Sequence, residues 1–395
     1  MLGSARRFLL LAAVLVVCVS CTGAPSTRVG PTSPASTTST AGPAAALPFG
    51  DPAATLLPAA DRAALQLVLD TAVAVFKRDP NSSAGTRGIT ATIITPRGHW
   101  SGAAGTGGDG TPLRAEAMMN IASITKTFTA AEVVSLAQRG LVDLDAPASQ
   151  YLDHPLLAQQ PTVRQLLSMR SGVPEHTNDT FFAAVTATPS KSWTATKALA
   201  YATGPPMPPG TEFAYTNSNY LLLGLLIEKV TTTTYADALR RDLLQQPNLQ
   251  RVAVQDSEAP TAPLGAPALD VATLPTDPYL PTRSLASAAG AAGGIAADAA
   301  SVARWGYDLY GGRLLSPNAV HQMTTAGPDG YGLGTAVESL SNLPWTGIGH
   351  TGGIPGYSTA LIVVPEHQTA VCVLLPHHSD AHYIARMLLM VPLTE

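Results

Sequence analysis

The sequence has few charged side chains for its length. Of its 395 residues, 13% are charged, and the formal net charge is −4. A nucleic-acid-binding surface needs a basic patch, so this charge balance argues against a nucleic-acid partner. Proline and glycine are abundant, but they follow no period that would indicate collagen or repeats. With 46% apolar residues, the chain has room for one large domain or two medium ones.

Cysteine is also scarce. The three cysteines are Cys18, Cys21 and Cys372, and two of them stand near the N-terminus. If the N-terminal leader is removed, Cys372 has no partner in the chain, which excludes a disulfide framework in the folded part. Cys372 lies in the apolar run 369–375, and we predict that it is a buried structural cysteine.

Metal and nucleotide motifs are missing from the sequence. His377, His378 and His382 stand near a predicted helix start, but no spaced set of carboxylates or cysteines accompanies them. No glycine-rich nucleotide loop is visible. We therefore expect no metal and no cofactor.

Residues 1–20 have the pattern of a secretory signal peptide, with two arginines before a short apolar run. The apolar run is shorter than a typical transmembrane helix. Cys21 resembles the lipidated cysteine of a bacterial lipobox, and Ser20 fits the position before it, whereas Cys18 departs from the usual Leu or Val. This resemblance implies a lipoprotein anchored to the cell membrane outside the cytoplasm. Plain secretion with cleavage nearby is the alternative.

Residues 21–57 are dominated by serine, threonine, proline and alanine, a composition that cannot bury a core. We expect a flexible tether there. The globular part then spans 58–395. It begins with a predicted helix at 61–76, with Asp61 as the N-cap, and a predicted hairpin at 89–101.

The middle of the globular part, from about 143 to 284, has mostly helical patterns, and residues 257–284 are expected to form a long loop. The end returns to strands at 356–364 and 369–375, followed by a helix at 381–390. Strands near both ends predict a sheet whose two halves come from opposite ends of the sequence. The helices between them would form a second lobe, with a cleft between the lobes.

Ser123 and Lys126 stand three positions apart at the start of a predicted helix that Gly140 stops. Positions i and i+3 of a helix face the same way. Ser123 is also a preferred N-cap residue, but that interpretation leaves Lys126 facing the positive end of the helix dipole. The same field, together with burial, would lower the lysine pKa. A neutral amine beside a serine hydroxyl is what an activated nucleophile needs.

Two further stretches add polar residues. Tyr215-Thr-Asn217 ends where an apolar helix is predicted to start, and Asn217 is therefore also a candidate N-cap. The alternative interpretation of Tyr215 is a buried tyrosine that only packs in the core. His350-Thr-Gly-Gly353 is predicted to open the penultimate strand.

In this order, Ser123-x-x-Lys126, Tyr215-x-Asn217 and His350-Thr-Gly352 resemble the three motifs of the penicillin-recognising serine hydrolases. The pattern is similar to the D-alanyl-D-alanine carboxypeptidases and the class C β-lactamase branch, because class A enzymes have Ser-Asp-Asn as the second motif. The resemblance extends from about residue 60 to the end. It implies an α/β (α+β) fold of the β-lactamase/transpeptidase type, with an antiparallel sheet flanked by helices and a mostly helical second lobe.

The resemblance also implies catalytic roles. Ser123 would attack a carbonyl carbon to form an acyl-enzyme, with Lys126 as the base. Tyr215 would pass a proton to the leaving nitrogen. Because a free tyrosine has a pKa near 10, Tyr215 would need a nearby cation, and Lys126 and His350 are the candidates.

Substrate-binding roles follow in the same way. Asn217 would hydrogen-bond the substrate amide and Lys126, and Thr351 would offer its hydroxyl to a carboxylate. The strand of His350 and Gly352 would pair with the substrate backbone, and glycine there would allow close approach of the ligand. The backbone N–H groups of Ser123 and Gly353 would form the oxyanion hole.

Histidine at position 350, where most β-lactamases have lysine, would make the charge of the site pH-dependent near neutrality. This departure weakens the case for efficient β-lactam hydrolysis. The expected function is therefore a D-alanyl-D-alanine carboxypeptidase or transpeptidase that acts on the peptidoglycan stem peptide and is acylated by β-lactams. An esterase or weak β-lactamase on the same fold, and a non-catalytic cell-wall lipoprotein, are the alternatives.

Overall fold

The computed structural model describes residues 47–76, 88–269 and 277–394. The predicted signal peptide, Cys21 and the tether up to residue 46 lie outside the described residues. No helix in the described part of the chain is both long enough and apolar enough to cross a membrane.

Residues 47–57, which the sequence analysis assigns to the tether, pack on the folded part. Phe49 and Leu57 are both 2% exposed. Phe49 N donates to Gly311 O at 2.8 Å, and Leu57 N donates to His99 O at 2.9 Å. The large apolar residues of this stretch are irregularly spaced between prolines and small residues and give no periodic pattern, so the sequence places the start of the fold about ten residues too late.

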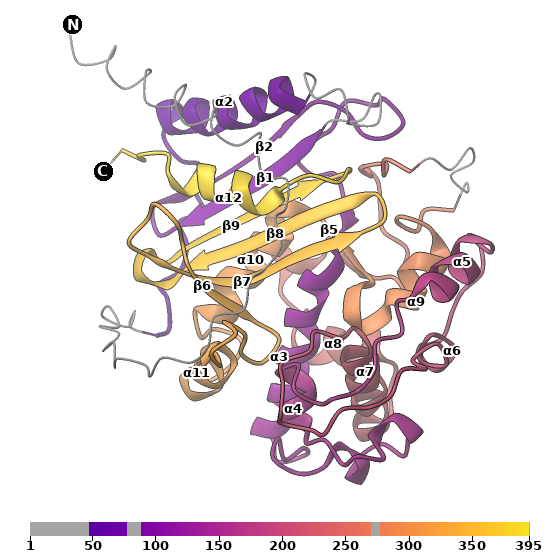
Figure 1. Cartoon of the computed structure of the whole chain (residues 1–395). Helices are drawn as coiled ribbons and strands as arrows, with labels where there is room; N and C mark the ends of the chain where they lie inside the picture. Colours follow the sequence, from indigo (N-terminus) through magenta and orange to yellow (C-terminus); the bar gives the residue numbers. More distant parts are fainter. Residues whose placement is uncertain (1–46, 77–87, 270–276, 395) are drawn as a thin grey trace, which may run out of the picture. The chain divides into compact units, whose positions relative to one another are not determined.

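Six antiparallel strands form the main sheet, in the order β2-β1-β9-β8-β7-β6 (Figure 1). Their bounds are β1 Ile89–Thr95, β2 Gly98–Ala104, β6 Ala336–Ser339, β7 Thr346–Ile354, β8 Tyr357–Val364 and β9 Thr369–Leu375. Because β1 pairs with β9, the N-terminal hairpin joins the C-terminal strands directly. This confirms the predicted sheet with halves from opposite ends of the sequence.

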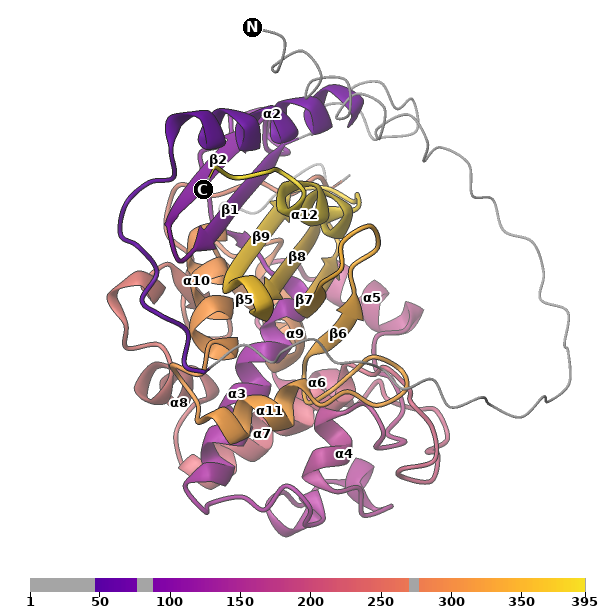
Figure 2. The ribbon, with the colours of Figure 1, turned by 90° about the vertical axis from the view of Figure 1, so that its left-hand side faces the viewer.

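Helices cover both faces of this sheet. On one face α2 (Ala59–Phe76) and α12 (Ala381–Leu389) lie against each other, and on the other face α10 (Ala299–Tyr310) packs on β1, β8 and β9 (Figure 2). Because helices cover both faces, every residue of β1 and β9 is buried, including the threonines of these strands. Cys372 in β9 is buried and free, as predicted.

The helical part of the chain surrounds α3, which follows a 3-10 turn, η1. Its elements are η1 Ala122–Ile124, α3 Thr125–Gln138, η2 Ala148–Gln150, η3 Pro155–Leu157, α4 Val163–Leu167, α5 Asp179–Thr186, α6 Ala195–Leu199, α7 Ser218–Thr231, α8 Tyr235–Asp242, η4 Pro247–Leu249, α9 Arg283–Gly293 and α11 Pro317–Thr324. A small sheet of β3 Met119–Asn120, β5 Ile295–Ala297 and β4 Val252–Val254 was not predicted. Strands of two or three residues are too short to produce an alternating pattern.

Two predicted details are wrong. Asp61 does not cap α2, which begins two residues earlier; its carboxylate accepts hydrogen bonds from Thr394 N at 3.1 Å and Thr394 Oγ1 at 2.9 Å. His350 to Gly353 do not open the penultimate strand. They lie in the second half of β7, the strand before it, because strand signals begin at Thr346.

A buried carboxyl group lies inside α3. Glu132 is fully buried, and this burial, together with the nearby Asp242 carboxylate, raises its pKa to about 8. Asp242 itself stays ionised because hydrogen bonding to Arg241 lowers its pKa to about 2. Glu132 is therefore protonated at neutral pH, next to an ionised Asp242.

Replacing Glu132 with glutamine (Glu132→Gln) tests this protonation state. The folded pKa is raised from 4.5 to about 8, so the wild type loses stability as pH rises through this window. The glutamine side chain is neutral, has nearly the same size and does not titrate. We expect the free energy of unfolding of the variant, minus that of the wild type, to increase by up to about 1.4 kcal/mol per pH unit in this window.

Denaturant unfolding between pH 5 and pH 9 measures the difference. Glu116→Gln, at an exposed glutamate, is the control and should leave the pH dependence unchanged. Parallel curves for wild type and Glu132→Gln would contradict the assignment of a protonated Glu132.

Candidate active site

Ser123 lies in η1, the turn that leads into α3. Ala122 before it has a φ of 47°, in the left-handed region, a conformation that costs a non-glycine residue about 1–2 kcal/mol. Asn120 Oδ1 holds this turn by accepting Ala122 N at 2.7 Å, and Thr359 Oγ1 of β8 donates to Ile121 O at 2.9 Å. The main sheet therefore fixes the position of the serine.

Lys126 meets Ser123 as the i, i+3 spacing predicts. Its side chain is fully buried, and Nζ lies 2.9 Å from Ser123 Oγ, 2.8 Å from Asn217 Oδ1 and 2.7 Å from Ala292 O. Burial lowers the pKa of Lys126 to about 7, although the charge of Glu175 raises it. Near neutrality the amine is thus deprotonated in a large fraction of molecules and able to accept the serine proton.

The capping interpretations do not hold. The N-cap positions of η1 and α3 have no side-chain cap hydrogen bond, so Ser123 does not cap the helix. Asn217 occupies the N-cap position of α7, but its side chain makes no cap bond there either. Its amide oxygen accepts from Lys126 instead.

Tyr215 lies beside the amine but is not acidified. The Nζ atom of Lys126 is 5.1 Å from the centroid of its ring, and the His350 ring centroid is 6.2 Å away. The side chain is 41% exposed, yet its phenol group is buried, and this burial raises the pKa of Tyr215. The charge of Glu175 raises the pKa further, and interaction with Ser123 lowers it only in part. The expected lowering by cations is wrong, and the phenol keeps its proton at neutral pH.

His350 is neutral. Its Nδ1 faces the carbonyl oxygen of Thr351 and therefore carries the proton, so Nε2 accepts from Tyr331 Oη at 3.0 Å. Burial, and secondarily the Lys126 charge, lower the pKa of His350 to about 3. The prediction that this residue titrates near neutrality is wrong, because its 6% exposure is not readable from the motif.

The glycines of the third motif have different roles. A Cβ added at Gly352 would lie 2.3 Å from Thr359 Oγ1, 2.6 Å from Ile121 O and 2.9 Å from Ala122 Cβ. The close approach that requires glycine here is thus to the turn of Ser123 rather than to a ligand. A Cβ at Gly353 would meet nothing within 4 Å.

A pocket of about 230 Å³ opens next to Ser123. It lies between β7 and the helices α5 and α9, where the sequence analysis expects a cleft. Most of its lining is apolar, with polar atoms from a few residues: Ala122, Ser123, His176, Thr177, Phe181, Phe182, Asn217, Leu285, Ala289, Ala292, Gly293, Gly353, Ile354 and Pro355. Gly353 thus lies in the same pocket as the nucleophile, whereas Thr351 is exposed on β7.

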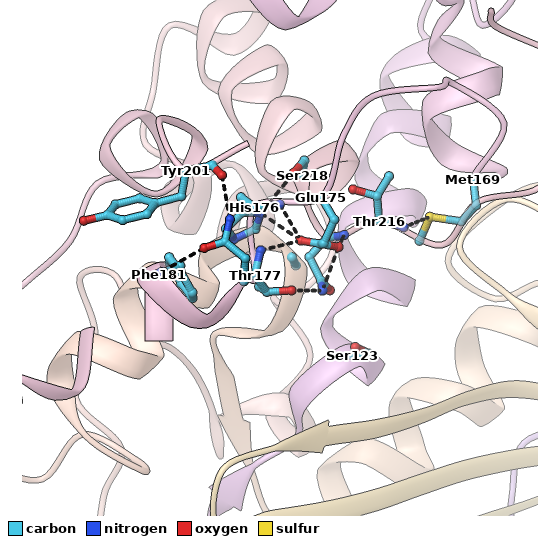
Figure 3. Close-up of polar contacts among 12 residues, drawn as sticks. Ser123, Met169, Glu175, His176, Thr177, Phe181, Tyr201, Thr216 and Ser218 are labelled. Atoms are coloured by element: carbon cyan, nitrogen blue, oxygen red, sulfur yellow. Dashed lines mark hydrogen bonds and ion pairs between the residues drawn. The ribbon is translucent and has the colours of Figure 1, made fainter. Parts of the chain in front are cut away.

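Glu175 and His176 are residues that sequence reasoning missed. Both belong to the loop between α4 and α5, and polar contacts connect Glu175 to Asn217 and His176 to Ser218 (Figure 3). No motif marks this loop; its only signal is a glutamate and a histidine between two predicted helices. Burial lowers the pKa of His176 to about 4, so it is neutral.

Within the described ranges, no group of three or more histidine, cysteine, aspartate or glutamate side chains is placed to hold a metal ion. Of the histidines near the C-terminus, His382 contacts Glu338 of β6, with Nε2 2.5 Å from Oε1.

Alanine at each of the two glycines separates their roles. Gly352→Ala places a methyl group against the backbone of the Ser123 turn, and we expect it to lower the free energy of unfolding by about 1–3 kcal/mol. Gly353→Ala meets open space and should stay within about 0.5 kcal/mol of the wild type. Denaturant unfolding measures both, and equal stability of the two variants would show that β7 does not press on this turn.

The family model described as Beta-lactamase matches residues 70–383. Protein flp of Staphylococcus aureus (strain COL) is 33% identical over 132 residues, which are 32% of this chain and 26% of that protein. Penicillin-binding protein 4* of Bacillus subtilis (strain 168) is 23% identical over 300 residues, 69% of this chain and 63% of that protein. The chain thus spans about a quarter of the length of the first relative and under two thirds of the second.

Solved structures resemble the whole described fold. A D-stereospecific amidohydrolase from Streptomyces sp. has a TM-score of 0.70 and 28% identity, covering 83% of this chain and 98% of that one. D-amino acid amidase from Ochrobactrum anthropi SV3 has a TM-score of 0.70 at 24% identity, with 84% and 98% covered. At that identity the likeness shows the fold alone. The match over most of the chain shows that this protein belongs to the β-lactamase family, within the penicillin-recognising serine hydrolase superfamily.

Proposed function

We propose that the chain is a serine hydrolase that forms an acyl-enzyme on Ser123 and acts on peptides or amides of D-amino acids. One observation carries the proposal: a fully buried amine, with its pKa lowered to about 7, lies 2.9 Å from the serine hydroxyl. Such a pair activates a nucleophile without a histidine.

The first half of the reaction forms the ester. Neutral Lys126 accepts the proton of Ser123, whose oxygen bonds to the substrate carbonyl carbon. The N–H groups of Ser123 and Gly353 stabilise the oxyanion. When the carbon–nitrogen bond breaks, the leaving nitrogen takes the proton of Tyr215, and Lys126 returns its proton to Tyr215. The raised pKa of Tyr215 supports a donor role, because the phenol is protonated when it is needed.

The second half releases the acid. A water molecule attacks the ester carbon and gives up a proton through Tyr215 to Lys126. The bond between the carbon and the oxygen of Ser123 breaks, and Lys126 returns the proton to that oxygen. Asn217, which lies in the pocket and contacts Lys126, is in place to bind the substrate amide.

The pocket supports a small, uncharged acyl group. Its volume of about 230 Å³ is below the range of drug-sized sites. Phe181, Phe182 and Leu285 provide apolar walls, and none of the described residues that line it is a lysine or arginine. A D-alanyl residue of a cell-wall peptide satisfies these limits, and so does another small D-amino acid.

The part of the site that would bind the leaving group favours a second candidate function, an amidase or esterase. A D-alanyl-D-alanine carboxypeptidase must bind a terminal carboxylate, for which the exposed Thr351 hydroxyl is available. His350 adds no charge, because its pKa is lowered to about 3. The missing charge favours an amidase or esterase whose leaving group has no carboxylate, and the Streptomyces D-stereospecific amidohydrolase supports it by likeness.

The N-terminal sequence supports a place for this activity. We propose that a lipid on Cys21 anchors the chain outside the cytoplasmic membrane, where a cell-wall peptide is accessible and β-lactams acylate Ser123. A non-catalytic lipoprotein would not need the complete set of Ser123, Lys126 and Tyr215.

Mass spectrometry after incubation with a penicillin tests the acyl-enzyme. We expect an adduct on Ser123 in the wild type and none in Ser123→Ala, which should also lose hydrolysis by roughly 10³-fold or more. Folded wild-type protein without an adduct, and without turnover of any substrate below, would exclude the acyl-enzyme.

The substrate class is decided by rates on a D-alanyl-D-alanine peptide, a D-alanine amide, a nitrophenyl ester and a chromogenic cephalosporin, measured side by side. Release of D-alanine from the peptide as the fastest reaction supports the carboxypeptidase. Faster cleavage of the amide or ester selects the second candidate, and cephalosporin turnover above the other three contradicts both.

A further inference from the structure

The carboxylate of Glu175 is saturated by the protein itself. Its Oε1 accepts His176 N and Thr177 N, both at 2.8 Å, and its Oε2 accepts Asn217 N at 2.6 Å and Asn217 Nδ2 at 3.2 Å (Figure 3). His176 Nδ1 is also 3.2 Å from Oε1. A carboxylate has about four lone-pair sites, so four N–H groups leave none for a substrate. Glu175 is accordingly not among the residues that line the pocket.

These bonds set the orientation of the Asn217 amide. Its Nδ2 donates to Glu175 at 3.2 Å, and its Oδ1 accepts from Lys126 Nζ at 2.8 Å. A flipped amide would put its oxygen against the carboxylate and its NH₂ group against the amine. Glu175 thus determines that Lys126 meets an acceptor.

Glu175 also differs in charge from everything else around the amine. The other titratable groups near Lys126 in the described chain are Tyr215, Tyr220, His176 and His350. Burial raises the pKa of both tyrosines and lowers that of both histidines, so all four are neutral near pH 7.

The carboxylate itself keeps its charge in this setting. Burial alone would raise the pKa of Glu175, but the backbone N–H groups of Thr177 and Asn217 lower it below its usual value. Glu175 is therefore the ionised neighbour that acts on Lys126, and its charge opposes the effect of burial there.

We propose that Glu175 is a positioning residue, whose carboxylate orients Asn217 towards Lys126 and supplies the negative charge that lets the buried amine hold a proton between its two transfers. The second transfer needs this proton, because Lys126 must return it to Tyr215 in the first half of the reaction and to Ser123 in the second. Only the kinetic part of the test rests on the proposed function.

Direct titration of Lys126 tests the charge. The chain has five lysines, so NMR of the full chain labelled with ¹³Cε-lysine resolves Lys126, assigned by its absence in Lys126→Arg. We expect a midpoint near 7 in the wild type and about one unit lower in Glu175→Gln, which removes the charge at nearly constant size. Glu175→Asp keeps the charge and should stay within about half a unit of the wild type.

Glu258→Gln is the matched control. Glu258 also holds a loop, accepting Val254 N at 2.7 Å and Arg240 Nε at 2.8 Å, but it is not among the groups that act on Lys126. The control should leave the Lys126 midpoint unchanged. A folded Glu175→Gln with the wild-type midpoint overturns the role of the charge, whether or not the chain hydrolyses any substrate.

Acylation kinetics test the positioning. With a nitrophenyl ester, the acid limb of kcat/KM in Glu175→Gln should move to lower pH by the same amount as the midpoint. Glu175→Asp is one methylene shorter and cannot hold both N–H groups of Asn217, so we expect a rate loss of about tenfold with the limb unmoved. Full wild-type rates in Glu175→Asp at every pH overturn the positioning role, including where Glu175→Gln does not fold.

Discussion

The buried amine of Lys126 is the constraint on which the site depends. A polar group taken from water costs free energy unless it is hydrogen-bonded. The three oxygens that meet it come from η1, from the loop before α7 and from the end of α9. Segments separated by up to 166 residues must therefore be in place before the amine is satisfied. The amine is therefore fully hydrogen-bonded only when η1, the loop before α7 and the end of α9 are all folded into place.

The sheet contributes to the same site from the other side. Gly352 in β7 allows the strand to approach the Ser123 turn, and Thr359 in β8 hydrogen-bonds the backbone of that turn. The left-handed Ala122 is a strained residue that these contacts hold in place. The serine thus gains its position from long-range packing, while its distance to the amine is local.

Few groups near the amine of Lys126 carry a charge. Both histidines and both tyrosines near the amine are neutral, and the ionised carboxylate of Glu175 is buried in N–H groups rather than offered to the pocket. A site with so little free charge favours uncharged groups on the acyl side. It also makes the proton affinity of Lys126 depend on few neighbours.

The local geometry and the outline of the fold can be predicted from the amino-acid sequence. The spacing of Ser123 and Lys126 puts both on one face of a turn, and the hairpins and the long helices follow from periodicity. Three motifs in order were enough to identify the superfamily. These features depend on residues close in sequence, or on the periodicity and motif order that the sequence itself displays.

The protonation states and the supporting residues, in contrast, depend on how distant segments pack against one another. The motif suggested a titrating His350 and an acidified Tyr215, but the pKa of each depends on how many atoms exclude water around it. The same holds for Glu132 of α3, whose pKa depends on its burial and on Asp242 of another helix. Glu175 and Gly352 acquired their roles through contacts with distant segments, and such contacts leave no periodic mark in a single sequence.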